Sequence, residues 1–153
     1  MSNQHHAPWE CIYRKEEKSD CKPGKRPRSD QKYFEILCLC LLQAGLNWGS
    51  IRKYWQKYKK GFYEFNIPRL SKAQAKELLK DPRVIKNSEK IEAIIYNARE
   101  FEKIKRGYGS FSNFLTSLRK SGDKELFKAL TKRFKHIGRY TTEYFLHSVG
   151  YQS

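Results

Sequence analysis

From residue 29 onward, apolar residues recur at the spacing of one helix face, and no segment alternates as a half-buried strand does. The clearest segment is 88–106, whose apolar stripe consists of Ile91, Ile94, Ile95, Ala98, Phe101 and Ile104. This stripe predicts a long amphipathic helix that ends at Gly107. Because the chain also lacks an internal repeat, the pattern predicts an all-α fold.

A second segment is apolar on nearly every face, which indicates a buried, central helix. Ser29 or Asp30 can cap its start, and Gly45 is expected to end it in a left-handed conformation. Cys38 and Cys40 fall inside this apolar run and are expected to be buried as small hydrophobic residues.

Further helices are expected from capping residues and from shorter apolar stripes. They are 48–60 after an Asn47 cap, a short helix from a Ser71 cap to Leu79 with Gln74 in a capping box, 110–122, 123–133 and 139–148. Trp55 is expected to pack inward. Residues 1–29 show no periodicity, and they carry seven Lys or Arg against four acids, with three Pro. The chain therefore divides into an irregular basic arm, 1–29, and a helical domain, 30–153.

The charge balance points to a polyanionic partner. Lys and Arg number 32 against 16 Asp and Glu, a formal net charge of +16. Such a field attracts nucleic acid, although the same excess is found in ribosomal proteins or in proteins that use Lys for solubility. Five cations and no acid fall in 51–60, which is either a solvated helix face or a track for phosphates.

The hydropathy of the chain bears on its location. With a mean hydropathy of −0.85, no window approaches the run of about 18 apolar residues that a membrane span needs. The first residues carry no apolar signal-peptide core. An intracellular protein is expected, in the cytoplasm and nucleoid or in the nucleus.

A turn between the last two expected helices, residues 134–142, has the composition of a phosphate-binding hairpin. Gly138 leaves room for close approach at a helix N-terminus, where backbone N–H groups attract anions. Lys135 and Arg139 flank it as positive charges. The alternative is an ordinary turn between helices.

A second turn, residues 43–48, joins the central helix to the basic one. Leu46 forms an apolar tip, and Trp48 follows it. This arrangement suits a wedge that fills the gap left by an extracted base, or a wall on which that base stacks. Taken alone, the turn favours the alternative of an ordinary helical corner packed by Leu46 and Trp48.

Three segments in order resemble the DNA-3-methyladenine glycosylase I family, within roughly residues 33–150. They are YFEILCLCLLQAGLNW (33–48), ELLKDPRVIKNSEKIEAIIYNAREF (77–101) and LTKRFKHIGRYTTEYFLHSVG (130–150). The most specific parts are QAGLNW, the Lys-Ile-x-Ala-x-x-x-Asn-Ala-Arg run and the Phe-Lys-x-Ile-Gly-x-x-Thr hairpin.

The resemblance implies a monomeric, monofunctional helix-hairpin-helix DNA glycosylase, a shortened helical bundle that flips and releases an alkylated, 3-methyladenine-like purine from double-stranded DNA. It implies a base pocket of Trp48, Cys40, Gln43 and Tyr13, a DNA wedge of Gly45 and Leu46, and backbone contacts from Lys135, His136, Gly138, Arg139 and Thr141. The alternatives are a non-catalytic DNA-binding protein on this fold, or a glycosylase with altered base specificity.

The sequence departs from the family at two sites. A pocket glutamate that contacts the exocyclic amine of the base corresponds to Cys40, which supplies no anionic acceptor. The resemblance also implies that the zinc ligands of the family are lost, with Ala7 and Arg14 at the N-terminal positions and the chain stopping before the C-terminal ones. No metal or other cofactor is therefore expected, although His5, His6, Cys11 and Cys21 leave a weak alternative zinc site. No residue is assigned a catalytic role, since a base that already carries positive charge is a good leaving group.

Overall fold

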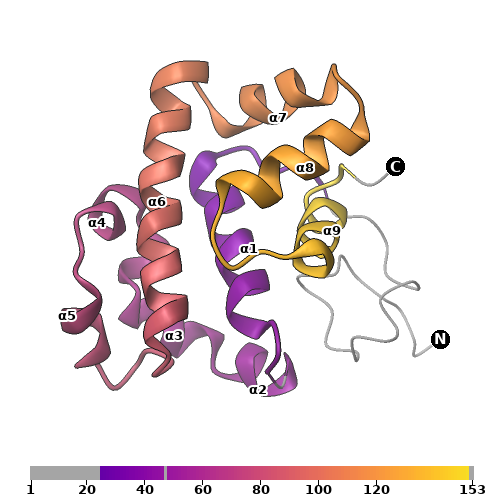
Figure 1. Cartoon of the computed structure of the whole chain (residues 1–153). Helices are drawn as coiled ribbons and strands as arrows, with labels where there is room; N and C mark the ends of the chain where they lie inside the picture. The colour runs from indigo at the N-terminus through magenta and orange to yellow at the C-terminus, as the bar shows by residue number, and fades with distance from the viewer. Residues whose placement is uncertain (1–24, 47, 152–153) are drawn as a thin grey trace.

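The computed structural model describes residues 25–46 and 48–151, apart from the side chain of Trp48. This described part contains helices and no strand, so the all-α prediction is confirmed (Figure 1). The elements are α1 (Asp30–Gln43), α2 (Trp48–Lys53), α3 (Trp55–Gly61), the 3-10 turn η3 (Tyr63–Phe65), α4 (Ile67–Ser71), α5 (Ala75–Leu79), α6 (Ser88–Tyr108), α7 (Phe111–Arg119), α8 (Asp123–Arg133) and α9 (Arg139–Ser148).

Helix α1 is the centre of the molecule, as its apolar run predicts. Ser29 caps it by accepting a hydrogen bond from the Lys32 backbone N–H at 3.1 Å. The helix packs against α6, α7 and α9. Every residue from Tyr33 to Gln43 is buried, including Cys38 and Cys40. A helix buried on all sides has a fixed position, so the turn that follows it is anchored from behind.

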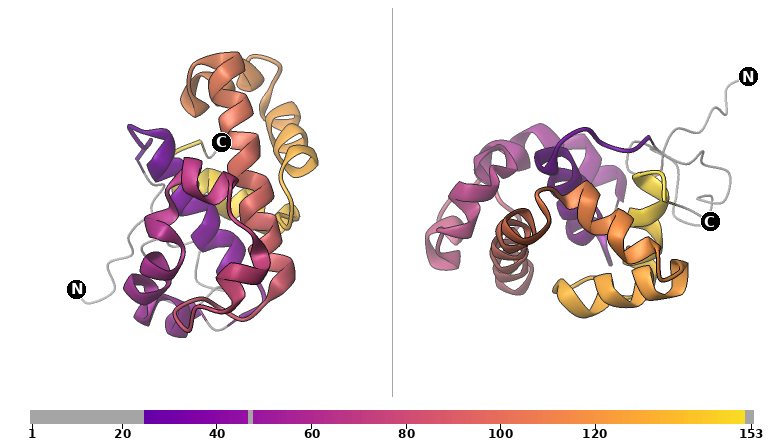
Figure 2. Two further views of the ribbon diagram at one scale, coloured as in Figure 1. Left: turned by 90° about the vertical axis from the view of Figure 1, so that its left-hand side faces the viewer. Right: turned by 90° about the horizontal axis from the view of Figure 1, so that it is seen from above.

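Helix α6 runs the length of the molecule beside α1 (Figures 1 and 2). Asn87 caps its start by accepting from the Lys90 backbone N–H at 3.1 Å. The predicted end at Gly107 is wrong, because Gly107 is helical and the helix ends at Gly109, whose φ is +86°. Helices α4 and α5 cover one side of α6, while α9 lies beyond α1 on the other.

The predicted limits of two further helices are also wrong. The segment 48–60 is two helices, since the backbone of Tyr54 leaves the helical region at φ −104° and ψ 20°. Ser71 does not cap a helix but ends α4, and α5 begins after Gln74, whose side chain makes no capping bond. Helix α4 starts at an Asn66 cap with a proline in its first turn, a signal present in the sequence that the apolar pattern hid.

Of the other boundaries, the predicted close of α7 at Gly122 is wrong, because α7 ends at Arg119 and Gly122 precedes α8; the rest agree closely with the sequence. Ser110 caps α7 by accepting from the Asn113 backbone N–H at 3.0 Å, and α8 and α9 have the predicted limits. Trp55 packs inward as expected, stacked on Phe65 with 5.2 Å between ring centroids. The Asn47 cap lies outside the described residues, as does most of the arm predicted for 1–29.

Candidate functional site

The turn after α1 projects an apolar side chain from the end of a buried helix. Gly45 adopts φ +76°, the left-handed conformation predicted for it, which suits glycine because a Cβ would be strained there. Leu46 follows with 42% of its surface exposed. Its backbone N–H donates to the Gln43 carbonyl at 3.0 Å, which closes the turn.

Lys90 of α6 holds this turn from the interior. Its Nζ donates to the carbonyl oxygens of Leu42 at 2.9 Å and of Ala44 at 2.6 Å. These carbonyls belong to the C-terminal end of α1, where the helix dipole favours a cation. Burial lowers the pKa of Lys90, since it penalises the charged form. The sequence showed Lys90 only as part of a family motif; its role as a clamp on the turn is visible in the structure alone.

The hairpin between α8 and α9 is anchored by apolar residues and exposes polar ones. Phe134 and Ile137 are buried, whereas Lys135 and His136 are exposed. His136 has φ +60°, a conformation that non-glycine residues adopt in tight turns. The buried pair therefore fixes the turn while its tip faces outward.

Asn97 of α6 clamps the same hairpin through both ends of its amide. Its Oδ1 accepts from the Lys135 backbone N–H at 2.9 Å, and its Nδ2 donates to the Lys135 carbonyl at 3.1 Å. Asn97 is 1% exposed, so its end of these two partly buried bonds is shielded from water. The Lys135 ammonium also lies 4.3 Å from the ring centroid of Tyr96. Sequence reasoning missed Asn97 as an anchor.

Gly138 stands at the start of α9 without a conformational need for glycine. Its φ of −84° is accessible to any residue, and a Cβ placed there meets no heavy atom within 4 Å. It also provides no side chain to cap α9. The side-chain position of Gly138 is therefore open space, with the exposed Arg139 next in the chain.

A cavity of about 140 Å³ separates the end of α1 from the start of α9. Its wall consists of Cys40, Gln43, Ala44, Gly45, Tyr140, Thr141 and Tyr144. We call it the α1–α9 cavity. Because Gly45 and Thr141 line the same space, the Leu46 turn and the Gly138 hairpin are neighbours on one side of the molecule.

The floor of this cavity is uncharged. Complete burial raises the pKa of the Cys40 thiol to about 12, so the thiol is protonated at neutral pH. Behind the wall, Arg52 of α2 donates from Nε to Gln43 Oε1 at 3.3 Å and from Nη2 to the Tyr144 hydroxyl at 3.0 Å. Arg52 therefore ties α2 to both helices of the cavity. Sequence analysis placed it only in a basic run.

The structure thus brings part of the expected site together. Cys40, Gln43, Gly45 and Thr141 line one cavity, and Thr141 is buried in its wall rather than exposed on the hairpin. The exposed hairpin residues are Lys135, His136, Gly138 and Arg139. Tyr13 and the side chain of Trp48 lie outside the described residues.

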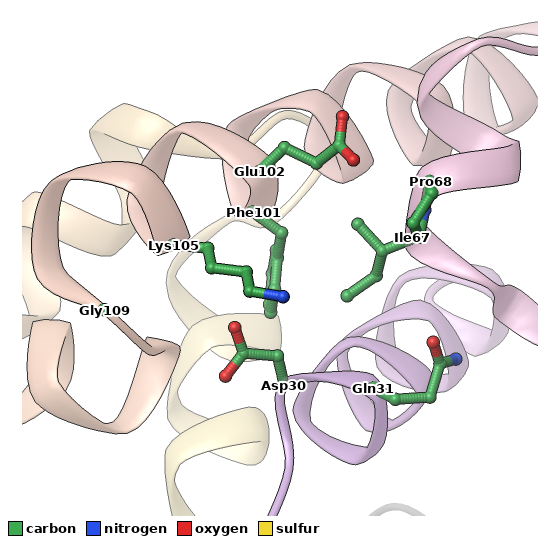
Figure 3. Close-up of a pocket in the computed structure, with 8 residues that line it drawn as sticks. All are labelled: Asp30, Gln31, Ile67, Pro68, Phe101, Glu102, Lys105 and Gly109. Carbon is green, nitrogen blue, oxygen red and sulfur yellow. The ribbon is translucent and has the colours of Figure 1, made fainter.

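A larger cavity, about 380 Å³, lies at the opposite end of α1 (Figure 3). Ile67 and Phe101 form apolar wall, and Lys105 and Asp30 point toward one another across it. Asp30 already accepts a hydrogen bond from the Phe111 backbone N–H at 2.9 Å, which joins α1 to α7. Since α1 separates this cavity from the Leu46 turn, its location does not suit a base extracted next to that turn.

Among the described residues, no group of three or more His, Cys, Asp or Glu is placed to hold a metal ion. No helix formed by them has the length and apolar character to span a membrane.

Comparison with known proteins identifies relatives over most of the chain. A family model described as methyladenine glycosylase matches residues 12–143. The DNA-3-methyladenine glycosylase of Haemophilus influenzae is 30% identical over 149 residues, covering 83% of this chain and 80% of that protein. DNA-3-methyladenine glycosylase 1 of Escherichia coli is 29% identical over 147 residues, covering 81% and 79%.

A solved structure supports the same comparison at the level of the fold. It belongs to 3-methyladenine DNA glycosylase I from Staphylococcus aureus and concerns the recognition of 3-methyladenine. Its TM-score with this chain is 0.73 at 27% sequence identity, with 86% of this chain and 82% of that chain covered. The arrangement of helices around α1 and α6 is therefore shared with that protein.

Proposed function

The chain belongs to the methyladenine glycosylase family, and on this premise we propose that it releases an alkylated purine from duplex DNA by hydrolysing the N-glycosidic bond. It is a monofunctional DNA glycosylase of alkylation repair. The observation that supports this activity here is the α1–α9 cavity, which lies between an apolar turn and a basic hairpin. A base must leave the helix stack before its glycosidic bond is accessible, so such an enzyme needs these three parts together.

Each part has a separate task in this proposal. Leu46 enters the stack in place of the extracted base, which limits the cost of unstacking. Lys135, Arg139 and the amides near Gly138 hold the DNA backbone, where positive charge and a helix N-terminus favour phosphate. Cys40, Gln43 and Thr141 form the wall of the base pocket, and Trp48 and Tyr13 are proposed to stack on the base.

The chemistry requires little from the protein beyond positioning. The bond between the base nitrogen and sugar C1′ breaks, and water supplies the hydroxyl that C1′ gains. An alkylated purine that is cationic in DNA leaves as a neutral base, and the remaining proton passes to solvent. Because the positive charge of the alkylated base already makes it a good leaving group, orientation of the base and of the water can account for catalysis. No carboxylate lines the described wall of the cavity.

The test is incubation of the protein with methylated duplex DNA, followed by chromatography of the released bases. We expect free methylpurine to accumulate with time, leaving abasic sites in the DNA. Trp48→Ala should abolish release, because the stacking surface is lost, while most non-specific duplex affinity stays. Binding of methylated DNA without release of any base would instead indicate a non-catalytic DNA-binding protein on this fold.

We further propose that the protein acts without a metal, as a monomer, on DNA inside the cell. The substitutions Ala7 and Arg14 at the N-terminal zinc-ligand positions of the family support the first point, since neither side chain can coordinate zinc. The presence of the turn, the cavity and the hairpin on one chain supports the second. Metal analysis and sedimentation of the purified protein test both; one zinc per chain or a stable dimer would refute them.

A further inference from the structure

Three acceptor atoms around the α1–α9 cavity are already bonded to donors of the protein, two of them cations, and this affects which base fits. Gln43 Oε1 accepts from Arg52. The Ala44 carbonyl accepts from the Lys90 ammonium at 2.6 Å. The Gln43 backbone carbonyl accepts from the Leu46 N–H at 3.0 Å. At the end of α1, three oxygens thus each already accept a hydrogen bond from the protein.

The bond from Arg52 also fixes which way the Gln43 amide points. A guanidinium has donors and no acceptor, so only the amide oxygen of Gln43 can face it. The amide then has its N–H groups left to offer to a molecule in the cavity. An exocyclic amine brought to the same oxygen would place its hydrogens beside the guanidinium, where like partial charges repel.

No described residue of the wall supplies a strong replacement acceptor. The described wall contains no carboxylate, and its hydroxyls, on Tyr140, Thr141 and Tyr144, can donate as well as accept. Cys40 is a neutral thiol, a weak partner for an amine. Two cations, Arg52 and Lys90, stand behind this wall. The described wall consequently offers hydrogen-bond donors and no anionic acceptor.

Adenine and guanine differ in the substituent at carbon 6, with which a donor-rich wall can form or fail to form a hydrogen bond. Carbon 6 of adenine carries an amine, which donates, and carbon 6 of guanine carries a carbonyl oxygen, which accepts. The two 3-methyl derivatives have the same ring charge in DNA, so the repulsion from the cations is common to both. The difference between the amine and the carbonyl at carbon 6 therefore determines which of the two bases the cavity binds better.

Resting on the proposed function, we propose that the α1–α9 cavity selects alkylated purines with a carbonyl oxygen at carbon 6, so that methylated guanine is preferred over methylated adenine. Gln43 is the specificity-determining residue, and Arg52 is the positioning residue that orients its amide. Sites that pair polar groups with one substrate reject an analogue that leaves those groups unpaired.

The experiment measures both bases in one reaction. Duplex DNA treated with a methylating agent is incubated with the whole protein, and released 3-methylguanine and 3-methyladenine are separated by chromatography. Each is expressed as a fraction of its total content, which acid depurination of the same DNA gives. We expect 3-methylguanine to be released about tenfold faster. Equal rates, or faster release of 3-methyladenine, overturn this inference but not the proposed function, whereas release of neither base overturns both.

Variants identify the residues responsible. Arg52→Met frees the Gln43 amide to turn, so the guanine preference should fall toward unity. Cys40→Glu adds an acceptor to the wall and should favour 3-methyladenine. Lys53→Met removes the same charge from the next position of α2, where the side chain is exposed, and should keep the ratio even if DNA affinity drops. An unchanged ratio in Arg52→Met, or the same change in Lys53→Met, overturns the role of Arg52.

Discussion

Lys90 and Asn97 lie about two turns apart on α6, and each fixes the backbone of a different surface turn. Lys90 binds the carbonyls at the end of α1, behind Leu46. Asn97 binds Lys135 in the hairpin before α9. A single helix therefore sets the distance between the proposed wedge and the proposed phosphate-binding hairpin, and a rigid spacing of this kind is what a protein needs to contact two parts of one duplex.

Removal of the Asn97 amide should loosen the hairpin. Asn97→Ala deletes two partly buried hydrogen bonds to Lys135 and removes the partner of the backbone N–H and carbonyl of that residue. We expect a loss of about 2–4 kcal/mol in the free energy of unfolding, from two such bonds. Duplex affinity should also fall at temperatures where the variant is folded.

The matched control is Asn113→Ala, which removes one exposed amide bond to the Tyr108 carbonyl at 2.9 Å. It should cost less than about 1 kcal/mol and leave duplex affinity unchanged. Urea denaturation and fluorescence anisotropy with a labelled duplex measure the two quantities. Equal loss of affinity in both variants would remove Asn97 from the binding mechanism.

Gly138 provides a test of phosphate contact that is separate from folding. A Cβ at this position meets no protein atom and no unfavourable φ, so Gly138→Ala should change the melting temperature little. If a phosphate lies against the backbone there, the added methyl group should still weaken duplex binding several-fold. Gly138→Asp should weaken it further, because a carboxylate would face the phosphate.

Gly107 serves as the comparison for Gly138. It lies within α6 and also faces open space, so Gly107→Ala should stabilise the helix by about 0.5–1 kcal/mol without an effect on DNA. Titrations at low salt give the affinities, and thermal denaturation gives the stabilities. Unaltered affinity in Gly138→Asp would show that the hairpin does not bind DNA.

The sequence predicted those parts of the fold that local signals determine. The apolar stripe of α6 and the caps at Ser29 and Ser110 are local, and the structure confirms them. The break at Tyr54 carries no Gly or Pro signal, and helix propensity continues across it, so periodicity could not show it. Where a helix is interrupted by its tertiary surroundings, a local pattern misses the break.

The candidate site also contains residues that local sequence signals predict and residues that only tertiary contacts show. Cys40 and Gln43 follow from a motif in contiguous residues. Arg52 and Asn97 act through contacts with residues distant in sequence, Tyr144 and Lys135 respectively, and only the packing of α1, α6 and α9 brings them together. Residues that position others are therefore the part of a site that sequence reasoning finds last.

The exposed tip of the turn after α1 should matter for catalysis and not for folding. Leu46 is 42% exposed in the free protein and only partly packed, so Leu46→Ala should lower the free energy of unfolding by no more than about 1 kcal/mol. In the proposed complex it replaces the extracted base in the stack. Since unstacking costs a few kcal/mol, its loss should slow base release about tenfold or more. Single-turnover release from methylated duplex measures this, and a rate equal to wild type would refute the wedge.

The buried thiols make stability depend on alkaline pH. Burial raises the pKa of Cys40 from 9.0 to about 12, and raises that of Cys38 as well. Above pH 9 the unfolded chain loses these protons while the native protein keeps them, so the unfolded state gains stability as pH rises. Each thiol should lower the free energy of unfolding by about 1.4 kcal/mol per pH unit between its unfolded and folded pKa values.

Cys40→Ala isolates this contribution from that of other groups that titrate in the same range. Urea denaturation at pH 8, 9 and 10 compares the two proteins. The variant should be less stable at pH 8, because it leaves a space in the core, and should lose stability less steeply above pH 9. Parallel curves would mean that Cys40 is ionised in the native state. An anionic thiolate would then be an acceptor in the α1–α9 cavity, and the argument for a donor-rich wall would no longer hold.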